Sequence, residues 1–430
     1  MATVCAAPDA AHMPELDERA AVRRLHDRFG FGPRPGDLDR GFAATLDRLL
    51  TPAPVATPAL TLDPPVLARG DKQAKKDANQ RRAVEEKALT SWWLARMVAT
   101  DTATERLTWF WHGHFATSEQ KVRSPWHMLA QNEAFRRLGL DGFPALARAM
   151  VVDPALLLWL DGNDNRAGSP NENLAREYLE LFTLGIGHYT EQDVREAARV
   201  LTGWTVRRDQ AEAQFVAKRH DDQPKTVLGI IGYFTVQSFV DAVLARPESA
   251  RFVVGRLWFR LVSATPPAAD TVDRLVSAHA KDIRSVLRAI AAEPAFRDPA
   301  TTLVKQPVEW ALGLMRALGV RWDSLDDKAV KQLGNGLRGM GQLPFRPPSV
   351  GGWAAGGAWL TTAAGVARVK VAQLLAAKAD LKSVTGADSV RELLSVDAWS
   401  DRTRDALSRV DKPEHLATVA ACAPEYVVSR

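Results

Sequence analysis

The stretch Glu105-Arg-Leu-Thr-Trp-Phe-Trp-His-Gly-His-Phe115 has the spacing of a helix and carries three side chains that can do chemistry. Glu105 and His112 are seven residues apart, so they share one helix face, where a carboxylate and an imidazole can bind one metal ion. His112 and His114 cannot face the same way on a helix, so both are ligands only if Gly113 ends it. The alternative is a helix end at which both histidines are hydrogen-bonded beside an aromatic core.

Helical spacing continues on both sides of this stretch. In the first half it predicts helices at residues 15–28, 36–50, 71–99, 103–111, 125–138, 143–152, 171–184 and 191–203. Between residues 204 and 232 apolar residues alternate between turn signals, which indicates a small β-hairpin. Helical spacing returns after residue 236, interrupted by a Gly- and Trp-rich loop at 345–359. The sequence therefore predicts a mainly α fold, more than half helical, with a small β-hairpin insertion around 204–232.

The composition is that of a globular protein with a large core, because 46% of the 430 residues are hydrophobic and 25% are charged. Residues 1–14 are expected to form a flexible lead-in. Two helical regions, 15–235 and 236–430, are expected to pack together as one unit, because no flexible linker separates them.

The charge pattern argues against nucleic acid as a partner. The 56 basic and 51 acidic residues are interspersed, and their net charge of +5 is not gathered in a basic block. No run of about 18 apolar residues exists, so we expect no integral membrane segment. The start of the chain lacks the pattern of a secretory signal, and we expect a cytoplasmic protein or an exported one whose signal is absent from this chain.

The two cysteines, Cys5 and Cys422, lie near opposite ends of the chain and exclude a dense disulfide framework or a cysteine-based zinc site. Any metal must therefore be held by His, Asp or Glu. The usual signatures of a phosphate-binding loop, an esterase elbow and a zinc protease helix are also missing from the sequence.

A second chemical motif lies at residues 171–181, where Asn173, Glu177 and Glu180 line one stripe of a predicted helix. Polar groups on an amphipathic helix usually face solvent. Arg176 lies between the acids and is able to hold a neighbouring carboxylate in place by a bidentate contact, which favours a functional interpretation.

A third motif is the pair His220-Asp221, in a turn-like segment after the predicted hairpin. Side chains of loops are free to converge on a site, so the pair is a candidate for metal binding. The alternative is an Asx-type turn beside a solvated histidine.

The loop at 345–359 places Trp353 and Trp359 among four glycines. Because no lysine opens a helix there, this loop is more typical of a pocket wall than of a phosphate cradle. Exposed tryptophans stack on sugar rings, so the loop is a candidate surface for a glycan or a protein partner.

Five of these motifs occur in order: FWHGHF at 110–115, NENLARE at 171–177, LFTLGIGHY at 181–189, HD at 220–221 and PPSVGGW at 347–353. Together they resemble the bacterial family DUF1800, over nearly the whole chain from about Leu25 to Tyr426. The family name records an unknown function, and its members are often exported, whereas this chain shows no clear signal. The resemblance implies a site at Asn171, Glu172, Asn173, Ala175, Arg176 and Glu177 without implying a reaction.

The residue types favour a metal-dependent enzyme, a hydrolase or an oxidoreductase, with a site built between helices. Histidines and carboxylates on helices suit iron or manganese, and zinc needs fewer ligands. The predicted metal ligands are His112, His114, Glu177, His220 and Asp221. The predicted catalytic residues are Glu105 or Glu177 as base, Arg176 as the group that orients the acids, and Asp221.

Two other classes remain open. In the first, the protein is a non-catalytic binding protein that holds a glycan or partner with the Trp-rich loop, and the polar motifs are buried networks that fix helices. In the second, Glu177 and Asp221 act without metal as an acid/base pair, which requires carboxylates roughly 5–9.5 Å apart across a cleft. The metal hypothesis predicts that Glu105, His112, His114, Glu177, His220 and Asp221 converge in space.

Overall fold

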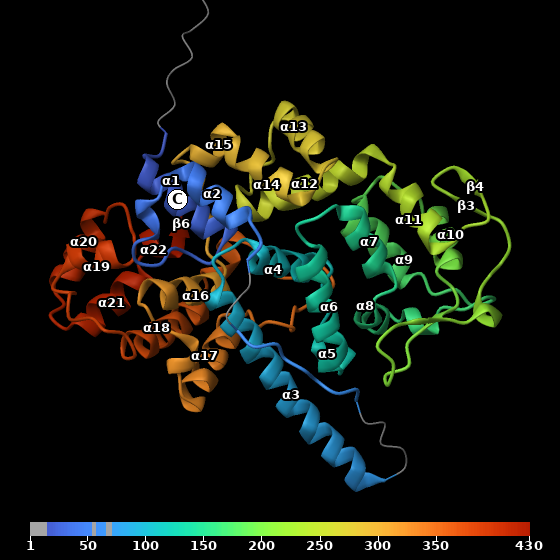
Figure 1. Ribbon diagram of the computed structural model, residues 1–430, viewed down its shortest axis with the longest axis horizontal. Helices are drawn as coiled ribbons and strands as arrows, with labels where there is room; N and C mark the ends of the chain where they lie inside the picture. The colour runs from blue at the N-terminus through green and yellow to red at the C-terminus, as the bar shows by residue number, and fades with distance from the viewer. Residues whose placement is uncertain (1–14, 54–56, 66–70) are drawn as a thin grey trace, which may run out of the picture.

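The computed structural model describes residues 15–53, 57–65 and 71–430, and the lead-in predicted for residues 1–14 lies outside them. The chain is 61% helix, with 22 α-helices in this described part, which confirms the mainly α prediction (Figure 1). None of the described helices has both the length and the apolar character that crossing a membrane requires.

Most helices are short and are joined by tight turns. The first ten are α1 (Glu18–Phe29), α2 (Phe42–Leu50), α3 (Lys72–Ala99), α4 (Thr104–His114), α5 (Glu119–Val122), α6 (Pro125–Leu138), α7 (Phe143–Val151), α8 (Pro154–Trp159), α9 (Asn173–Glu177) and α10 (Glu191–Val200). The others are α11 (Val236–Leu244), α12 (Pro247–Leu261), α13 (Ala269–His279), α14 (Ile283–Ala292), α15 (Pro294–Arg297), α16 (Pro307–Ala317), α17 (Asp327–Gly339), α18 (Thr362–Ala376), α19 (Ala387–Leu393), α20 (Asp401–Ser408), α21 (Pro413–Cys422) and α22 (Pro424–Val427).

Strands form three antiparallel two-stranded sheets. Two of them lie in the predicted window: β1 (Trp204–Thr205) with β2 (Gln214–Phe215), and β3 (Lys225–Val227) with β4 (Ile230–Gly232). Leu228 and Gly229 connect the second pair with φ angles of 51° and 81°, as the twist of a two-residue hairpin requires. The third pair, β5 (Leu303–Val304) with β6 (Val428–Ser429), joins segments far apart in sequence.

One predicted helix, 171–184, departs from α geometry. After α9 the chain continues as a π-helical turn, Tyr178–Thr183. The N–H of Leu184 donates to the carbonyl of Leu179, five residues back, at 2.9 Å. π-turns are rare and occur frequently at functional sites.

The buried apolar side chains form two clusters, and α4 contributes to both of them. Its residues Leu107, Phe110 and Trp111 belong to the first cluster, together with helices α7 to α14. Trp109, on the opposite side, belongs to the second cluster with α16 to α18 and α21. In Figure 1, α4 accordingly lies between the red and orange helices and the green ones. The clusters do not divide the chain near residue 235.

Helix α1 is fixed by two buried arginines. Arg24 donates to the carbonyls of Phe296 at 2.6 Å and Thr301 at 3.0 Å. Arg28 donates to the carbonyl of Ser429 at 2.9 Å and to its hydroxyl at 3.1 Å. The segments around β5 and β6 are thereby held against the first helix.

Glu105 clamps the start of α4 and is fully buried. Its carboxylate accepts hydrogen bonds from Arg136 at 2.6 and 2.9 Å, from Arg96 at 3.1 Å and from the Trp93 indole at 2.9 Å. Burial alone would raise its pKa, but the hydrogen bonds and charges of Arg136 and Arg96 hold the pKa below its usual range. Every oxygen is saturated by protein donors, so Glu105 joins α3, α4 and α6 and is not available as a base or ligand.

The other end of α4 touches the Trp-rich loop through two glycines. Gly352 has a φ of +78°, and a Cβ at this position would overlap the carbonyl of Gly113. Only glycine satisfies both the left-handed conformation and the close backbone approach. The contact places Trp353 on α4, where it stacks on Trp109 at 4.7 Å between ring centres.

We expect Glu105→Gln to lower the free energy of unfolding by about 3–5 kcal/mol, because one partner of a buried ion pair is removed. Chemical denaturation near pH 7 measures this. Asp405→Asn, which breaks an exposed pair with Arg409, serves as control and should cost under about 1 kcal/mol. Because the folded pKa of Glu105 lies below its ordinary value of 4.5, the difference from wild type should shrink as pH falls below that value. An equal effect of the two substitutions at pH 7 would contradict the clamp.

Gly352→Ala should destabilise the protein by more than about 2 kcal/mol, since backbone strain and overlap with Gly113 add together. Its neighbour Gly351 is the matched control. A Cβ there meets only Ser349 Oγ at 3.6 Å, and its φ is not in the left-handed region, so Gly351→Ala should cost under about 1 kcal/mol. The melting temperatures of both variants, measured by thermal unfolding, test this prediction. Similar values would refute the close contact between Gly352 and Gly113.

Candidate functional site

The predicted metal ligands do not form one site. Among the residues that the structure describes, no three His, Cys, Asp or Glu side chains are grouped as a metal ion requires. The physical reason is that most of the predicted ligands already have protein partners, as the following contacts show. The described residues therefore offer no ready set of ligands for an iron, manganese or zinc ion. The metal-dependent reaction stays a prediction.

His112 holds the Trp-rich loop. Its Nε2 accepts the backbone N–H of Phe345 at 3.1 Å, and the rings of Trp93 and Trp353 lie 5.2 and 5.3 Å away. Burial lowers its pKa to about 3, so the imidazole is neutral. Because α4 continues through Gly113, the condition for His112 and His114 to be joint ligands is not met.

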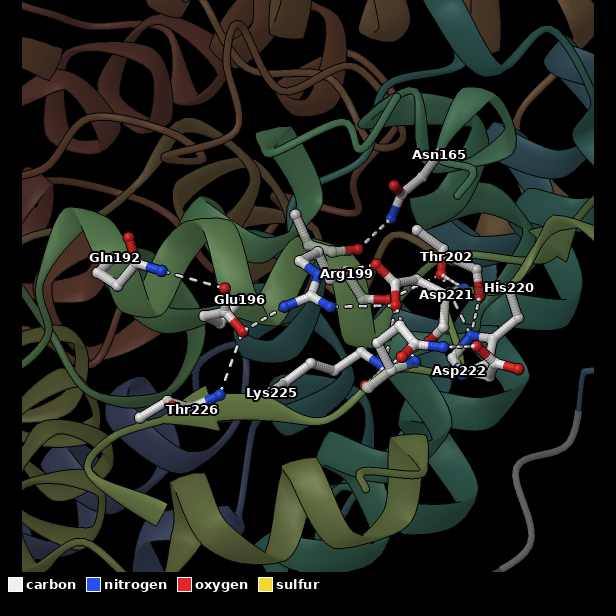
Figure 2. A network of polar contacts seen from close by, with 12 residues as sticks. Asn165, Gln192, Glu196, Arg199, Thr202, His220, Asp221, Asp222, Lys225 and Thr226 are labelled. Carbon is white, nitrogen blue, oxygen red and sulfur yellow. Dashed lines mark hydrogen bonds and ion pairs between the residues drawn. The ribbon is translucent and has the colours of Figure 1, made fainter. Parts of the chain in front are cut away.

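His220 and Asp221 form a turn that is fixed to α10, in agreement with the alternative interpretation. Asp221 accepts the N–H of Gln223 at 3.0 Å, which is the bond of an Asx turn, and two bonds from Arg199 at 2.7 and 3.1 Å. His220 Nδ1 donates to the Thr202 carbonyl at 3.0 Å. Figure 2 shows Arg199 held between Asp221 and Glu196. The network saturates the carboxylate and ties the loop before β3 to the helix.

Arg176 is partly exposed and makes a bidentate contact with a neighbouring carboxylate, that of Glu191. It binds Glu191 at 2.7 Å and Glu172 at 3.1 Å, which connects α9 to the start of α10. Glu177 is half-buried, and its carboxylate has no hydrogen bond or ion pair with the described residues. Its pKa is raised by burial and by the neighbouring Glu180.

His114 is the predicted residue that remains available for chemistry. Its Nε2 donates to the carbonyl of Phe182, in the π-turn, at 2.9 Å. Nδ1 therefore carries a lone pair, and it is buried without a partner. Burial, together with the charges of Arg256 and Arg260, lowers the pKa of His114 to about 3. The motif at 171–184 thus contacts His114 through the backbone carbonyl of Phe182, and Glu177 takes no part in this contact.

An inner pocket opens beside His114, between α4, α12 and the Trp-rich loop. It has room for about one water-sized group, about 20 Å³. It is lined by Arg106, Trp109, Phe110, Gly113, His114, Arg256, Arg260, Leu261, Gln306 and Trp353. Besides His114 Nδ1, the Nε1 of Trp353 and the Nε of Arg256 are buried here without a hydrogen-bond partner.

The inner pocket is strongly cationic, because its lining contains three arginines and no acid. Arg106 is neutralised by Glu309. Arg260 donates to the carbonyls of Trp353 at 2.7 Å and Ala354 at 3.0 Å, and its pKa is lowered to about 10 by burial and by Arg256. Arg256 has no hydrogen bond or ion pair with any residue in the described part of the chain, so its charge is uncompensated.

An outer hollow of about 420 Å³ adjoins the inner pocket and shares His114 and Arg256 with it. Most of its other lining residues are apolar, among them Leu181, Leu184, Ile186, Phe252 and Val350. Glu180, His188, Glu248 and Arg251 complete the wall. A ligand can therefore place one small polar group inside and a larger body outside.

The sequence interpretation missed Arg256 and Arg260. The sequence signal for them was a pair of arginines one helical turn apart in the apolar segment 252–261. Like charges at this spacing repel each other and destabilise a helix, so such a pair indicates a function. The pocket-wall role predicted for the Trp-rich loop fits the position of Trp353.

Comparison with curated proteins and with solved structures finds no match. A family model described as "Protein of unknown function (DUF1800)" matches residues 24–428, which is almost the whole chain. The protein therefore belongs to the DUF1800 family.

Proposed function

We propose that the protein binds a small organic acid across the inner pocket and the outer hollow, with one oxygen of the acid in the inner pocket. The observation that carries this proposal is that three residues lining the cationic inner pocket, His114, Arg256 and Trp353, each have a buried polar atom without a partner. Buried polar groups in folded proteins are nearly always hydrogen-bonded, and those without partners need an explanation such as a ligand. An arginine without a counter-charge supplies the attraction for a carboxylate or a similar oxyanion.

The three atoms also define the chemistry of the ligand. Arg256 and Trp353 offer hydrogen-bond donors, which suit the anionic oxygens. Nδ1 of His114 is an acceptor, so it requires an O–H or N–H of the ligand and would repel a second anionic oxygen. Hydroxy acids and acidic sugars carry both groups on neighbouring carbons, and the outer hollow has space for the rest of such a molecule.

This proposal develops the binding-protein alternative, with the Trp-rich loop as one wall. Metal-free catalysis by Glu177 and Asp221 is not part of it, because Asp221 is bound by Arg199 and neither carboxylate lines the two cavities. A reaction of the bound acid remains a prediction made from the sequence alone.

Calorimetry with matched pairs of acids tests the proposal. Lactate and glycolate should bind more tightly than propionate and acetate, which lack the hydroxyl. Arg256→Met should weaken binding of every acid by about tenfold or more, as expected for one charge-assisted bond. Arg288→Met, on α14 and paired with Asp47, lines neither cavity, so it is the control and should change affinity less than threefold. Equal losses in both variants, or no binding of any acid at 10 mM, would disprove the site.

His114→Phe tests the acceptor. It should reduce the affinity for lactate to that for propionate and leave propionate binding unchanged, because only the hydroxyl contact is lost. Since the pKa of His114 is near 3, lactate affinity in the wild type should be constant between pH 5.5 and 8. A fall or rise of affinity centred near pH 6.5 would show a titrating imidazole and contradict the assignment. Melting curves of the variant check that it is folded.

A further inference from the structure

A second cationic hollow lies away from His114, beside the first half of α3. Its volume is about 340 Å³, and it is open to solvent on one side. Its lining comes from the segment before α3, from α3 itself, from the turn between α5 and α6, from the start of α6 and from the loop after β1. The lining residues are Pro65, Ala78, Arg81, Arg82, Glu85, Arg123, Pro125 and Arg208.

The positive charge of this hollow is only partly neutralised. Arg81 binds Glu85 at 2.7 Å and Asp63 at 2.9 Å, and Arg82 lies 3.4 Å from Glu86. Arg123 and Arg208 have no acidic partner in the part of the chain that the structure describes.

The buried carboxyl group of Glu119 does not compensate the charges of Arg123 and Arg208. Glu119 is 2% exposed, and both of its carboxylate oxygens lack a hydrogen-bond partner. Burial, with a smaller contribution from Glu86, raises its pKa to about 8, so this group is largely uncharged at neutral pH. Arg123 and Arg208, from different elements, therefore face one cavity whose acidic lining residue, Glu85, is already paired with Arg81.

The two uncompensated arginines are positioned by the fold. Arg208 donates to the carbonyl of Val122 at 2.6 Å, at the end of α5. Its loop is fixed to α6, because His127 Nε2 donates to the carbonyl of Gln210 at 2.9 Å. Arg123 follows Val122 with a φ of 51°, a strained conformation for a residue other than glycine. Arg208 is thereby held in place, and guanidinium groups match the oxygens of phosphate and sulfate.

We propose that this hollow is a second, independent anion site that binds a phosphate or sulfate group through Arg123 and Arg208. The group is either the free ion or the end of a small ester, since both present the same oxygens. The proposal does not depend on the organic-acid pocket, because the two cavities share no lining residue.

Calorimetry with inorganic phosphate and inorganic sulfate tests the second site, in the full chain carrying Arg256→Met so that the first site does not contribute. Added Arg208→Gln or Arg123→Gln should each weaken binding by about tenfold or more, as expected for lost charge-assisted bonds. Arg338→Gln, on the exposed side of α17, changes the net charge equally and should alter affinity less than twofold. Arg208→Lys keeps the positive charge but lacks the planar guanidinium group with its paired donors. Its affinity for phosphate should therefore lie between those of the wild type and Arg208→Gln.

The outcomes separate the two sites. Equal weakening by Arg208→Gln and Arg338→Gln would mean that net charge alone attracts the ions and would overturn the proposal, as would the absence of binding at 10 mM. Retained phosphate binding in Arg256→Met, lost only on adding Arg208→Gln, supports it. Tighter binding of a phosphate monoester than of free phosphate identifies the ester as the preferred form. The reverse order identifies the free ion.

Discussion

The close approach of Gly352 to Gly113 is the constraint on which the candidate site depends. Two backbones touch there without an intervening side chain, so the Trp-rich loop lies directly on α4. Arg260 then reaches the loop carbonyls from α12, and Trp353 covers the cavity beside His114. This contact, for which position 352 requires glycine, acts together with the Arg260 hydrogen bonds and the Trp353–Trp109 stack to hold the walls of the pocket.

The elements that depend on local chemistry could be predicted from sequence. The start of α6 follows from Pro125 at its first position, and the start of α10 from the capping box that Thr190 and Asp193 form. The Asx turn at Asp221 was among the alternatives for the same reason. The spacing of Arg256 and Arg260 was a local signal, but their placement beside His114 could not be predicted, because it results from packing between segments far apart in the sequence. The π-turn replaces the α geometry that the spacing of residues 171–184 indicated.

Two of the acidic residues that the sequence assigned to the site are already bound by arginines. A buried carboxylate is stable only with cations or hydrogen-bond donors close by. In this chain, arginine side chains supply the cations. Glu105 is saturated by Arg136 and Arg96, and Asp221 by Arg199. His114 differs, because a backbone carbonyl satisfies one of its nitrogens and nothing satisfies the other. A mixture of His, Asp and Glu in sequence therefore says less about metals where arginine is abundant.

The buried arginines of α1 have a consequence for biosynthesis. Arg24 obtains its acceptors from residues 296–301, and Arg28 obtains its own from residues 262 and 429. While the ribosome is still translating the middle of the chain, these guanidinium groups have no native partners, and the apolar face of α1 cannot be buried without leaving charges unpaired. Helix α1 is thus among the last elements to reach its final place.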